Sequence, residues 1–477
     1  MIISIIFVFL YRTNPEIRQY RSKSGFVYKN SIMKVQLFTE IQKEFQFFPE
    51  QDLERFKNRF FNSELGKIYK AIPWNDLVRD FNIKEEPTGR PFLFPAHGRL
   101  ALMFLKNYSN LSDAKLIEQL NGNIEWQFFC GIYLGFNRIE NYKIVSQIRC
   151  ELSQNMNIQK LQKTLFDFWQ PFIKEQDKIT MDATCYESEV RYPTDIKLLW
   201  ECVEWSYVRM RQVSKVLNQA QLRSKYLKWK RRYVSYSKMR RKTKKKRRAL
   251  HRSSLKLIKK FVDFLSEHRQ YMSGRDNAML HIVKQVYTQQ YAWFYKNIKP
   301  KNRIVSLHKN YLRPIVRGKE IKPVEFGAKV NKIQIGGISF IEHLSFNAFN
   351  EGTRFTSSIH LAQQLTRSKI KVAGADAIYA TNANRKFATS QNIKTDFKPK
   401  GPRRKDRKAQ DQLKQLIQKE RATRLEGSFG KDKEHYHLRK IKARTKANEI
   451  LWIFFGIHTS NALEIGRKMF QQLRSVA

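Results

Sequence analysis

The chain has 477 residues, with 91 Lys and Arg against 42 Asp and Glu, and so carries a formal net charge of +49. Hydrophobic residues make up 42% and aromatic residues 13% of the sequence, which excludes a chain that is disordered throughout. At roughly 150 residues per domain, the length predicts about three domains. The excess of positive charge predicts a polyanionic partner, of which nucleic acid is the commonest.

The N-terminal segment and the cysteines bear on the cellular setting. Residues 1–10 are almost wholly apolar, but a membrane-spanning helix needs about 20 residues. No basic n-region precedes them and no small-residue cleavage site follows. We interpret residues 1–32 as an extension outside the folded core, with Met33 as the alternative start. No other segment predicts a membrane span. No CxxC pair occurs among the four cysteines, which argues against a zinc cluster and favours a reduced, cytoplasmic setting.

Residues 33–150 predict a compact helical domain. Apolar residues between Leu100 and Tyr108 recur at near-helical spacing, which is typical of a helix with a buried face. Ser112 is a candidate N-cap for the helix that follows. This spacing alone indicates a helical bundle and says nothing about DNA.

Three carboxylates stand out because of the segments that precede them. Residues 178–182 predict a short strand that ends in Asp182, and residues 370–375 predict a second strand followed by Asp376. A strongly helical segment from residue 410 to 425 leads to Glu426. Taken singly, a strand-end Asp usually caps a turn, and a helical Glu is usually solvated.

The order strand-Asp, strand-Asp, helix-Glu is the order that an RNase H-like core presents. Neighbouring strand ends and a facing helix bring three oxygen ligands to one place, and Mg²⁺ prefers oxygen ligands. Two such ions flank an in-line attack at phosphorus. Between the two aspartates, residues 324–330 and 333–341 predict strands, and Gly336-Gly337 predicts a hairpin turn.

Local motifs strengthen this interpretation. Thr180-Met181-Asp182-Ala183-Thr184, Ala375-Asp376-Ala377-Ile378-Tyr379 and Arg424-Leu425-Glu426-Gly427-Ser428 resemble the two Asp motifs and the Glu motif of bacterial insertion-sequence DDE transposases. The segments from Arg313 to Lys319 and from Glu325 to Lys329 resemble the region before and within the second strand of that family. The stretch from Gly89-Arg90-Pro91 to Trp126 resembles the N-terminal helical domain common in these transposases.

The resemblance implies that Asp182, Asp376 and Glu426 bind the catalytic metal, with two Mg²⁺ ions expected and Mn²⁺ as the alternative. Family members carry a Tyr-x2-Arg-x3-Glu-x6-Lys signature, and Glu426 and Lys433 fit its spacing. Lys419 stands at the Tyr position and Ala422 at the Arg position.

The signature leaves the phosphate-contacting arginine open. Arg421 and Arg424 flank Ala422, so either is a candidate for this role. Lys433 is expected to contact the DNA backbone near the metals. The histidines that follow, His435, His437 and His458, predict surface or capping positions rather than metal ligands.

The segment from Ser206 to Lys260 carries 22 Lys and Arg and no Asp or Glu. Like charges repel, so the fold does not need such a run, and it predicts contact with a nucleic acid backbone. A solvated helix face is the alternative. The aromatic residues within it predict helix packing more than stacking on bases. The residues expected to contact DNA in its densest part are Arg240, Arg241, Lys244, Lys245, Lys246, Arg247 and Arg248.

The expected fold is mixed α+β: an N-terminal helical domain and an RNase H-like α/β core, interrupted by a long basic helical insertion. The expected ranges are 33–150 for the helical domain, 151–195 for the start of the core, 196–305 for the insertion, 306–465 for the rest of the core, and 466–477 for a tail.

The expected function is that of a DDE transposase, which binds the terminal inverted repeats of an insertion sequence, cleaves a strand and joins its 3′-OH to target DNA. The partners would be double-stranded DNA and a second copy of the chain, the location cytoplasmic and nucleoid-associated, with no membrane. Two alternatives remain: a catalytically inactive or co-opted DNA-binding relative, and a structural RNA-binding protein. Inverted repeats flanking the gene distinguish a mobile element from a co-opted protein.

Overall fold

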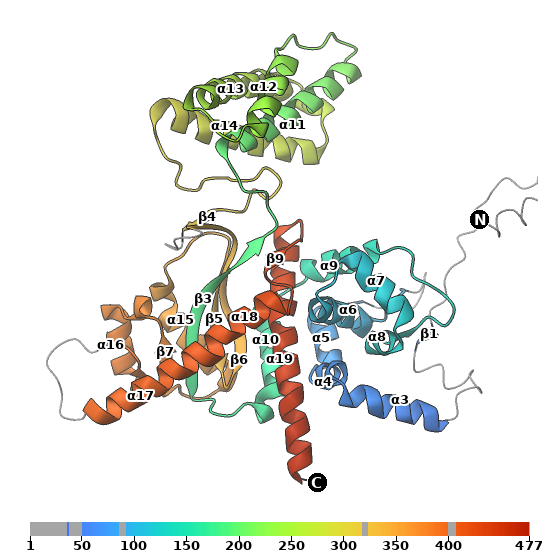
Figure 1. The fold of residues 1–477 in the computed structure, drawn as a ribbon, viewed down its shortest axis with the longest axis vertical. Coiled ribbons are helices and arrows are strands. Elements are labelled where there is room, and N and C mark those ends of the chain that lie inside the picture. Colours follow the sequence, from blue (N-terminus) through green and yellow to red (C-terminus); the bar gives the residue numbers. More distant parts are fainter. Residues whose placement is uncertain (1–35, 38–49, 85–91, 317–322, 399–406, 477) are drawn as a thin grey trace, which may run out of the picture.

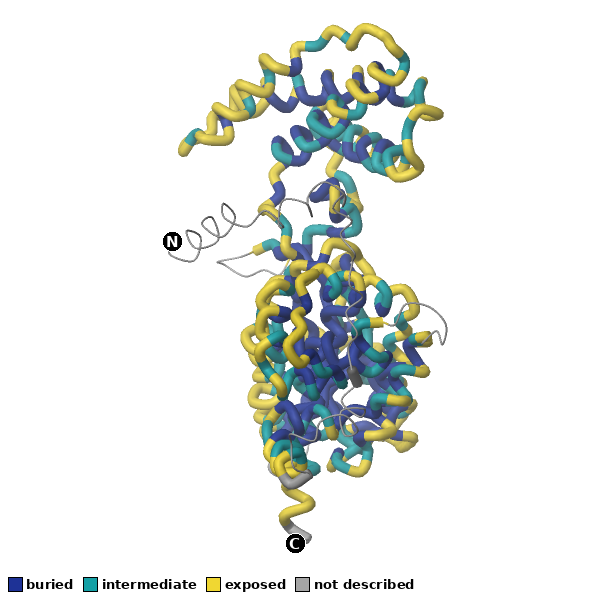
Figure 2. The backbone as a smooth tube through the Cα atoms, turned by 90° about the vertical axis from the view of Figure 1, so that its right-hand side faces the viewer, coloured by how far each residue is buried: buried dark blue, intermediate teal, exposed yellow. Residues whose placement is uncertain are grey.

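The computed structural model describes residues 36–37, 50–84, 92–316, 323–398 and 407–476 (Figure 1). The expected extension at 1–32, Met33, and the motif residues Gly89, Arg90, Pro91, Gly318 and Lys319 lie outside the described residues. Within them, the architecture is mixed α/β and mostly helical. Figure 2 shows that buried residues gather in two bodies, a large lower one and a smaller upper one.

The first helices form an N-terminal helical unit. Its central helix is α6 (Ala96–Ser109), which is buried on nearly all sides from Leu100 to Asn107. Ser112 accepts a hydrogen bond from Lys115 N, which confirms it as the N-cap of α7. The elements of this unit are α3 (Glu50–Asn62), α4 (Glu64–Lys70), α5 (Trp74–Asp80), α6, α7 (Asp113–Gly122), α8 (Ile124–Phe129) and α9 (Lys143–Gln154), with β1 (Gln36–Leu37) paired to β2 (Ile132–Tyr133). Helix α9 runs across the expected boundary at residue 150.

A seven-stranded mixed sheet follows the N-terminal unit. Its strands are β3 (Lys178–Ser188), β4 (Pro314–Val316), β5 (Val324–Ile335), β6 (Ile338–Ser345), β7 (Val372–Ala375), β8 (Lys394–Thr395) and β9 (Lys440–Ile441). The order is β4-β5-β3-β7-β8, with β6 also paired to β5 and β9 also paired to β3. Strands β5 and β6 run antiparallel to their neighbours, whereas β7 and β8 continue the sheet in the direction of β3.

Two strands differ from the sequence-based expectation. Strand β3 does not end at Asp182 but continues to Ser188, because nine of its residues pair with β5. Separate strands were expected at 324–330 and 333–341. Residues 324–335 instead form one continuous strand, β5, and its hairpin partner β6 begins at Ile338. The turn at Gly336-Gly337 is confirmed: both residues have positive φ, 54° and 87°, as a two-residue hairpin of the type I′ class requires.

The remaining helices cover the sheet. They are α10 (Ile158–Trp169), α15 (Phe355–Thr366), α16 (Asn382–Ser390), α17 (Arg407–Glu420), a π-helical turn η6 (Arg421–Glu426), α18 (Gly427–Glu434) and α19 (Lys446–Val476). Ile179 and Met181 of β3 share a hydrophobic cluster with residues of α10, α15 and α19. In Figure 1, α17 and α18 run as one long helix across the sheet. Residues 466–476, expected as a tail, are instead the last three turns of α19.

Between β3 and β5 the chain forms an inserted four-helix unit. Its helices are α11 (Asp195–Val216), α12 (Tyr226–Lys238), α13 (Lys244–Glu267) and α14 (Gly274–Lys296). They have a hydrophobic cluster of their own, in which α11 and α13 contribute most of the buried residues. Figure 1 shows this unit standing apart from the sheet, beyond the end of β3. None of the helices in the described part of the chain combines the length and the apolar character that a membrane span requires.

Candidate active site

The structure brings Asp182 and Asp376 to neighbouring positions on adjacent parallel strands. Met181 of β3 lies opposite Ala375 of β7, so the residues that follow them, the two aspartates, stand at the same level of the sheet. Strand β7 ends there because Asp376 is the N-cap of a short 3₁₀ turn, η5 (Ala377–Tyr379), and accepts the Ala377 N–H at 2.7 Å. We call these two residues the aspartate pair.

The carboxyl group of Asp182 lies in an environment that disfavours its charge. Its pKa is raised to about 6, mainly by burial; the Ala183 N–H and the Arg421 guanidinium lower the pKa, whereas Glu351 and Asp376 raise it. The Ala183 N–H donates to Asp182 Oδ1 at 2.7 Å. A partly buried carboxyl group with a raised pKa and other carboxylates nearby is a candidate for a functional site.

Of the two candidate arginines, Arg421 faces the aspartate pair. Its Nη1 lies 3.6 Å from Asp376 Oδ1 and 3.9 Å from Asp396 Oδ2, and its side chain is only 19% exposed. Arg424 is 56% exposed and pairs with Glu420 at 2.9 Å instead. Asp396 in turn accepts the Ala375 N–H at 3.1 Å, so it fixes the end of β7 beside the aspartate pair.

A glycine allows the helix of the Glu motif to approach the sheet. A Cβ on Gly374 of β7 would lie 2.5 Å from Ile417 Cγ2 of α17, so a larger residue would push this helix away. After α17 the chain widens into the π-helical turn η6, a feature that often accompanies functional sites. Leu425 is fully buried against the sheet, whereas the next residue, Glu426, is exposed on the flank of the helix.

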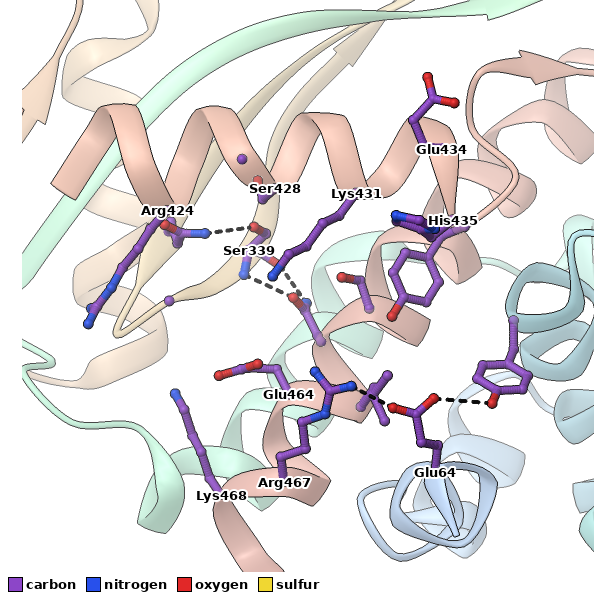
Figure 3. A pocket seen from close by; sticks show the side chains of 18 of the residues that line it. Glu64, Ser339, Arg424, Ser428, Lys431, Glu434, His435, Glu464, Arg467 and Lys468 are labelled. Carbon is purple, nitrogen blue, oxygen red and sulfur yellow. Dashed lines mark hydrogen bonds and ion pairs between the residues drawn. The ribbon is translucent and has the colours of Figure 1, made fainter. Parts of the chain in front are cut away.

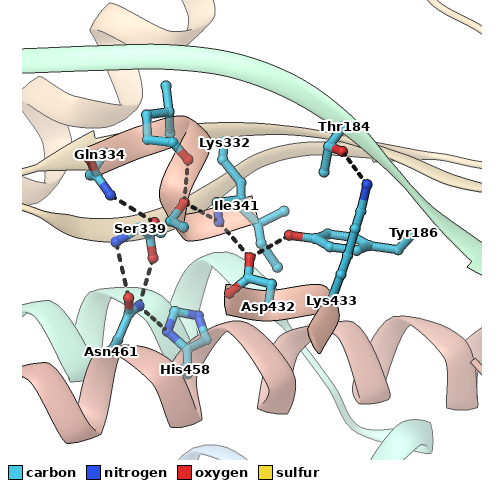
Figure 4. A network of polar contacts seen from close by, with 12 residues as sticks. Thr184, Tyr186, Lys332, Gln334, Ser339, Ile341, Asp432, Lys433, His458 and Asn461 are labelled. Carbon is cyan, nitrogen blue, oxygen red and sulfur yellow. Dashed lines mark hydrogen bonds and ion pairs between the residues drawn. The ribbon is translucent and has the colours of Figure 1, made fainter. Parts of the chain in front are cut away.

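Glu426 and Lys433 lie on the same flank, because seven residues make about two helical turns. Lys433 Nζ donates to Thr184 Oγ1 at 3.0 Å (Figure 4). Thr184 follows Asp182 by two residues and so points to the same face of β3. Lys433 therefore reaches the strand of the aspartate pair.

The Glu426 carboxylate does not join the aspartate pair. It makes no hydrogen bond or ion pair with another residue that the structure describes. Nor do the described residues contain a group of three or more Asp, Glu, His or Cys side chains arranged to hold a metal ion. The two aspartates have the oxygen donors that Mg²⁺ prefers, and the third donor stands apart from them.

Glu351 is an acidic neighbour of the aspartate pair that the sequence did not single out. It begins a 3₁₀ turn, η4 (Glu351–Arg354), and pairs with Lys329 of β5 at 2.7 Å. Asn384 Nδ2 donates both to Gly352 O at 2.6 Å and to Tyr379 O at 2.8 Å, and so ties η4 to η5. In the sequence Glu351 stands in an ordinary loop, and only its place beside η5 reveals it.

A buried polar network fixes α18 on the sheet (Figure 4). Lys332 of β5, the residue opposite Asp182, donates to Asp432 Oδ2 at 2.6 Å and to Ser428 Oγ at 3.0 Å. The Tyr186 hydroxyl of β3 donates to the same Asp432 oxygen at 2.6 Å. The network therefore fixes the distance between β3 and the side of the helix that carries Glu426 and Lys433.

A cavity of about 800 Å³ lies on the other side of α18 (Figure 3). Its walls come from α4, α6, the β5–β6 hairpin, α18 and α19, so it separates the N-terminal helical unit from the sheet. Four cations, Arg424, Lys431, Arg467 and Lys468, line it together with three acids, Glu64, Glu434 and Glu464. The aspartate pair and Glu426 do not line it. The cavity therefore lacks both a single sign of charge and the candidate catalytic residues, and we do not assign it to DNA cleavage.

The basic residues predicted to contact DNA lie around the α12–α13 connection. Arg240, Arg241, Lys244, Lys245, Lys246 and Arg248 are exposed. Arg247 is exposed too, but its Nη2 lies 2.8 Å from Asp195 Oδ2 and ties α13 to the start of α11. Cations in a first helical turn oppose the helix dipole, and the Thr243 cap, which accepts the Lys246 N–H, offsets this by only about 1 kcal/mol. Local helix stability therefore does not explain this run.

The aromatic residues of the basic segment are packed, as the sequence predicted. Tyr226 stacks on Tyr207 at 3.7 Å between ring centres, and Tyr233 stacks on Trp200 at 4.7 Å. One histidine prediction was wrong, since His458 is fully buried and not at the surface. Its pKa falls to about 3 because burial disfavours the charged ring.

Comparison with known proteins identifies a family for the N-terminal part of the chain. Residues 52–151 match the family model of the transposase domain DUF772. No curated protein and no solved structure matches the chain. The matched range covers the N-terminal helical unit from α3 into α9, and it supports a transposase. It ends before β3, so it does not include the aspartate pair.

Proposed function

We propose that the protein is a DDE transposase of an insertion sequence, which cleaves the ends of the element and joins them to target DNA. The observation that carries the proposal is the aspartate pair. Asp182 and Asp376, the residues of the two Asp motifs, are 194 positions apart in the sequence and adjacent in the sheet. The transposase domain match at residues 52–151 supports the same class of protein from an independent part of the chain.

An RNase H-like core is part of this proposal. Two neighbouring strands carry the aspartates, and the helix that crosses them carries the Glu motif. The inserted four-helix unit lies between β3 and β5, and thus between the first and the second Asp motif. This arrangement supports a catalytic core that is interrupted by a basic insertion.

Asp182 and Asp376 would hold Mg²⁺, or Mn²⁺ in its place, with Glu426 as the expected third ligand. A divalent cation bound there supplies positive charge that stabilises the phosphate under attack. The neighbouring residues of the chain then have definable roles. Arg421 orients Asp376 from 3.6 Å, and Lys433 presents an ammonium group beside the strand of Asp182.

The proposed partner is double-stranded DNA, and pairing of two element ends requires a second copy of the chain. The exposed cations of the α12–α13 connection would bind the DNA backbone without reading its sequence. The exposed position of Glu426 favours one alternative, a catalytically inactive, transposase-derived DNA-binding protein.

A cleavage assay tests the proposal and separates the two functions. Supercoiled DNA that carries the element's own ends is incubated with the protein and Mg²⁺, and nicks are mapped at the ends. We expect Asp182→Asn, Asp376→Asn and Glu426→Gln each to abolish nicking while DNA binding persists. Glu434→Gln, an exposed acid on the same helix, is the matched control and should nick normally.

Two results would contradict the proposal, one for the site and one for the activity. Nicking that persists in all three variants would refute the assigned site. Binding to the ends without nicking by the wild-type protein would establish the inactive alternative.

A further inference from the structure

The inserted four-helix unit contains a second cavity, which has no part in the aspartate site. It has a volume of about 550 Å³ and lies between the start of α12 and the middle of α13. The residues that line it are Arg223, Ser224, Lys225, Trp229, Ser253, Lys256, Leu257 and Lys260. We call it the α12–α13 pocket.

The walls of the α12–α13 pocket are held in place by the fold. Leu257 is buried in the hydrophobic cluster of the four-helix unit and forms the floor. Lys260 Nζ donates to Arg223 O at 2.6 Å, which ties the segment before α12 to the side of α13. The pocket is therefore preformed rather than created by a ligand.

The charge of this pocket is of one sign. Four of the eight lining residues are Lys or Arg, and none is Asp or Glu. Lys256 and Lys260 are one turn apart on α13, a spacing at which like charges destabilise a helix by a few tenths of a kcal/mol. Lys260 bonds to Arg223 O, but no acid among the lining residues offsets the charge, and an anionic ligand would relieve the repulsion. The hydroxyl groups of Ser224 and Ser253 add neutral donors, as phosphate-binding surfaces commonly do.

The aromatic wall favours duplex over single-stranded nucleic acid. Proteins that bind single strands offer exposed rings on which bases stack. Trp229 instead packs against the hydrophobic cluster, and the Arg232 guanidinium carbon lies 4.7 Å from its ring centre. Arg232 thus competes with bases for this ring, and the lining residues of the pocket offer mainly charges and hydroxyl groups.

We propose that the α12–α13 pocket binds phosphate groups of a duplex DNA backbone. This inference rests on the proposed function and extends it, because the pocket belongs to the inserted four-helix unit and not to the aspartate site. The four-helix unit stands apart from the sheet that carries the aspartate pair (Figure 1). The DNA segment held there would therefore be distinct from the one that is cut.

The salt dependence of DNA binding by the full chain tests the pocket. The double variant Arg223→Gln/Lys256→Gln removes two of its cations. The control Arg275→Gln/Lys296→Gln removes two exposed cations from α14, so both proteins have the same reduction in charge. The Kd for a random duplex is measured by fluorescence anisotropy across a series of salt concentrations.

The expected result follows from the number of phosphates that the pocket neutralises. Each phosphate that is no longer neutralised lowers the log–log slope by about 0.9. The slope of the pocket variant should therefore fall by roughly 2, and its binding should weaken roughly tenfold to hundredfold near 0.1 M salt. The control should keep the wild-type slope.

Two further variants distinguish a loss of DNA contacts from a folding defect. Lys256→Arg keeps the charge and should keep the slope. Ser253→Asp keeps all four cations but places an acid among them, and it should weaken binding as well. Far-UV circular dichroism and denaturant unfolding check that each variant is folded.

The possible outcomes distinguish the pocket from the wider proposal. Equal slopes for the pocket variant and the control would overturn the pocket and leave the cleavage function standing. The same titration is run with a single-stranded RNA, and a variant that loses RNA binding while its duplex binding is unchanged would overturn the proposal in favour of an RNA site. Failure of the wild-type protein to bind duplex DNA would overturn both proposals.

Discussion

Lys332 and Asp432 form a buried ion pair that joins the sheet to the helix of the Glu motif. The Lys332 side chain is 0% exposed and that of Asp432 is 2% exposed, and Nζ lies 2.6 Å from Oδ2. Lys332 also stands opposite Asp182 in the sheet. The height of α18 above the aspartate pair is thus set by two charges that water does not reach.

Removing one member of this pair should be costly. We expect Lys332→Met to lower the free energy of unfolding by about 3–5 kcal/mol, because it leaves the Asp432 charge buried and uncompensated. The double variant Lys332→Met/Asp432→Leu should recover most of the loss, since no buried charge remains. Urea unfolding measures both, with the exposed Lys369→Met as a control expected to stay within about 0.5 kcal/mol of wild type. A single variant as stable as the control would show that water enters this site.

Lys433 should matter for cleavage and little for DNA affinity. Its ammonium group bonds to Thr184, two residues from Asp182, so it acts where the phosphate would react. We expect Lys433→Met to lower the single-turnover rate of end cleavage by roughly tenfold to a hundredfold, which is about 1.4–2.7 kcal/mol in the barrier. The control is Arg439→Gln, an exposed cation in the following loop. A fall in affinity with an unchanged rate would make Lys433 a simple backbone contact.

The exposed cations at the start of α13 should contribute directly to the salt slope. Replacing Lys244, Lys245, Lys246 and Arg248 by Gln should lower the slope by as much as 0.9 for each phosphate that these residues neutralise. Arg247 is left in place because its pair with Asp195 holds α13 to α11. Electrophoretic mobility shifts across a salt series provide the measurement. An unchanged slope would identify the run as a solvated helix face.

The β5–β6 turn offers a matched pair of substitutions. Gly336 and Gly337 both have positive φ, so alanine strains the backbone at either position. A Cβ at Gly336 would also lie 2.5 Å from Lys174 O, whereas at Gly337 it would meet open space. We expect Gly337→Ala to cost about 1 kcal/mol and Gly336→Ala to cost clearly more, as measured by urea unfolding. Equal losses of unfolding free energy in the two variants would mean that the backbone at Lys174 moves aside without destabilising the fold.

The buried His458 should make the fold sensitive to acid. Burial, and secondarily Lys332, hold its pKa near 3, below the value of about 6.5 in an unfolded chain. The unfolded state therefore binds the proton more readily, and stability falls as the pH drops from 6.5 toward 3. Between pH 6.5 and pH 5 we expect this group to contribute a loss of roughly 1.5 kcal/mol.

Unfolding curves at several pH values check the contribution of His458. In His458→Gln, stability should decline less over this range, whatever its absolute value. An identical pH dependence in the two proteins would mean that the ring is protonated in the folded state.

The sequence by itself predicted much of the local structure and supplied the candidate site residues. Ser112 was recognisable as an N-cap and Gly336-Gly337 as a hairpin turn, because capping and positive φ depend on a few neighbouring residues. The segments before Asp376 and Glu426 were recognisable from their apolar and helical patterns. Because motifs are linear, the transposase resemblance was also present in the sequence.

Only the tertiary structure decided how these residues meet. The extension of β3 beyond Asp182 depends on pairing with β5, more than 140 residues away in the chain, and local propensity cannot encode a partner so distant. The choice of Arg421 over Arg424 depends on which side of a π-helical turn faces the sheet. The neighbourhood of Glu351, the exposure of Glu426 and the one-signed α12–α13 pocket likewise arise from packing between elements, where burial and charge are determined by what the fold places nearby.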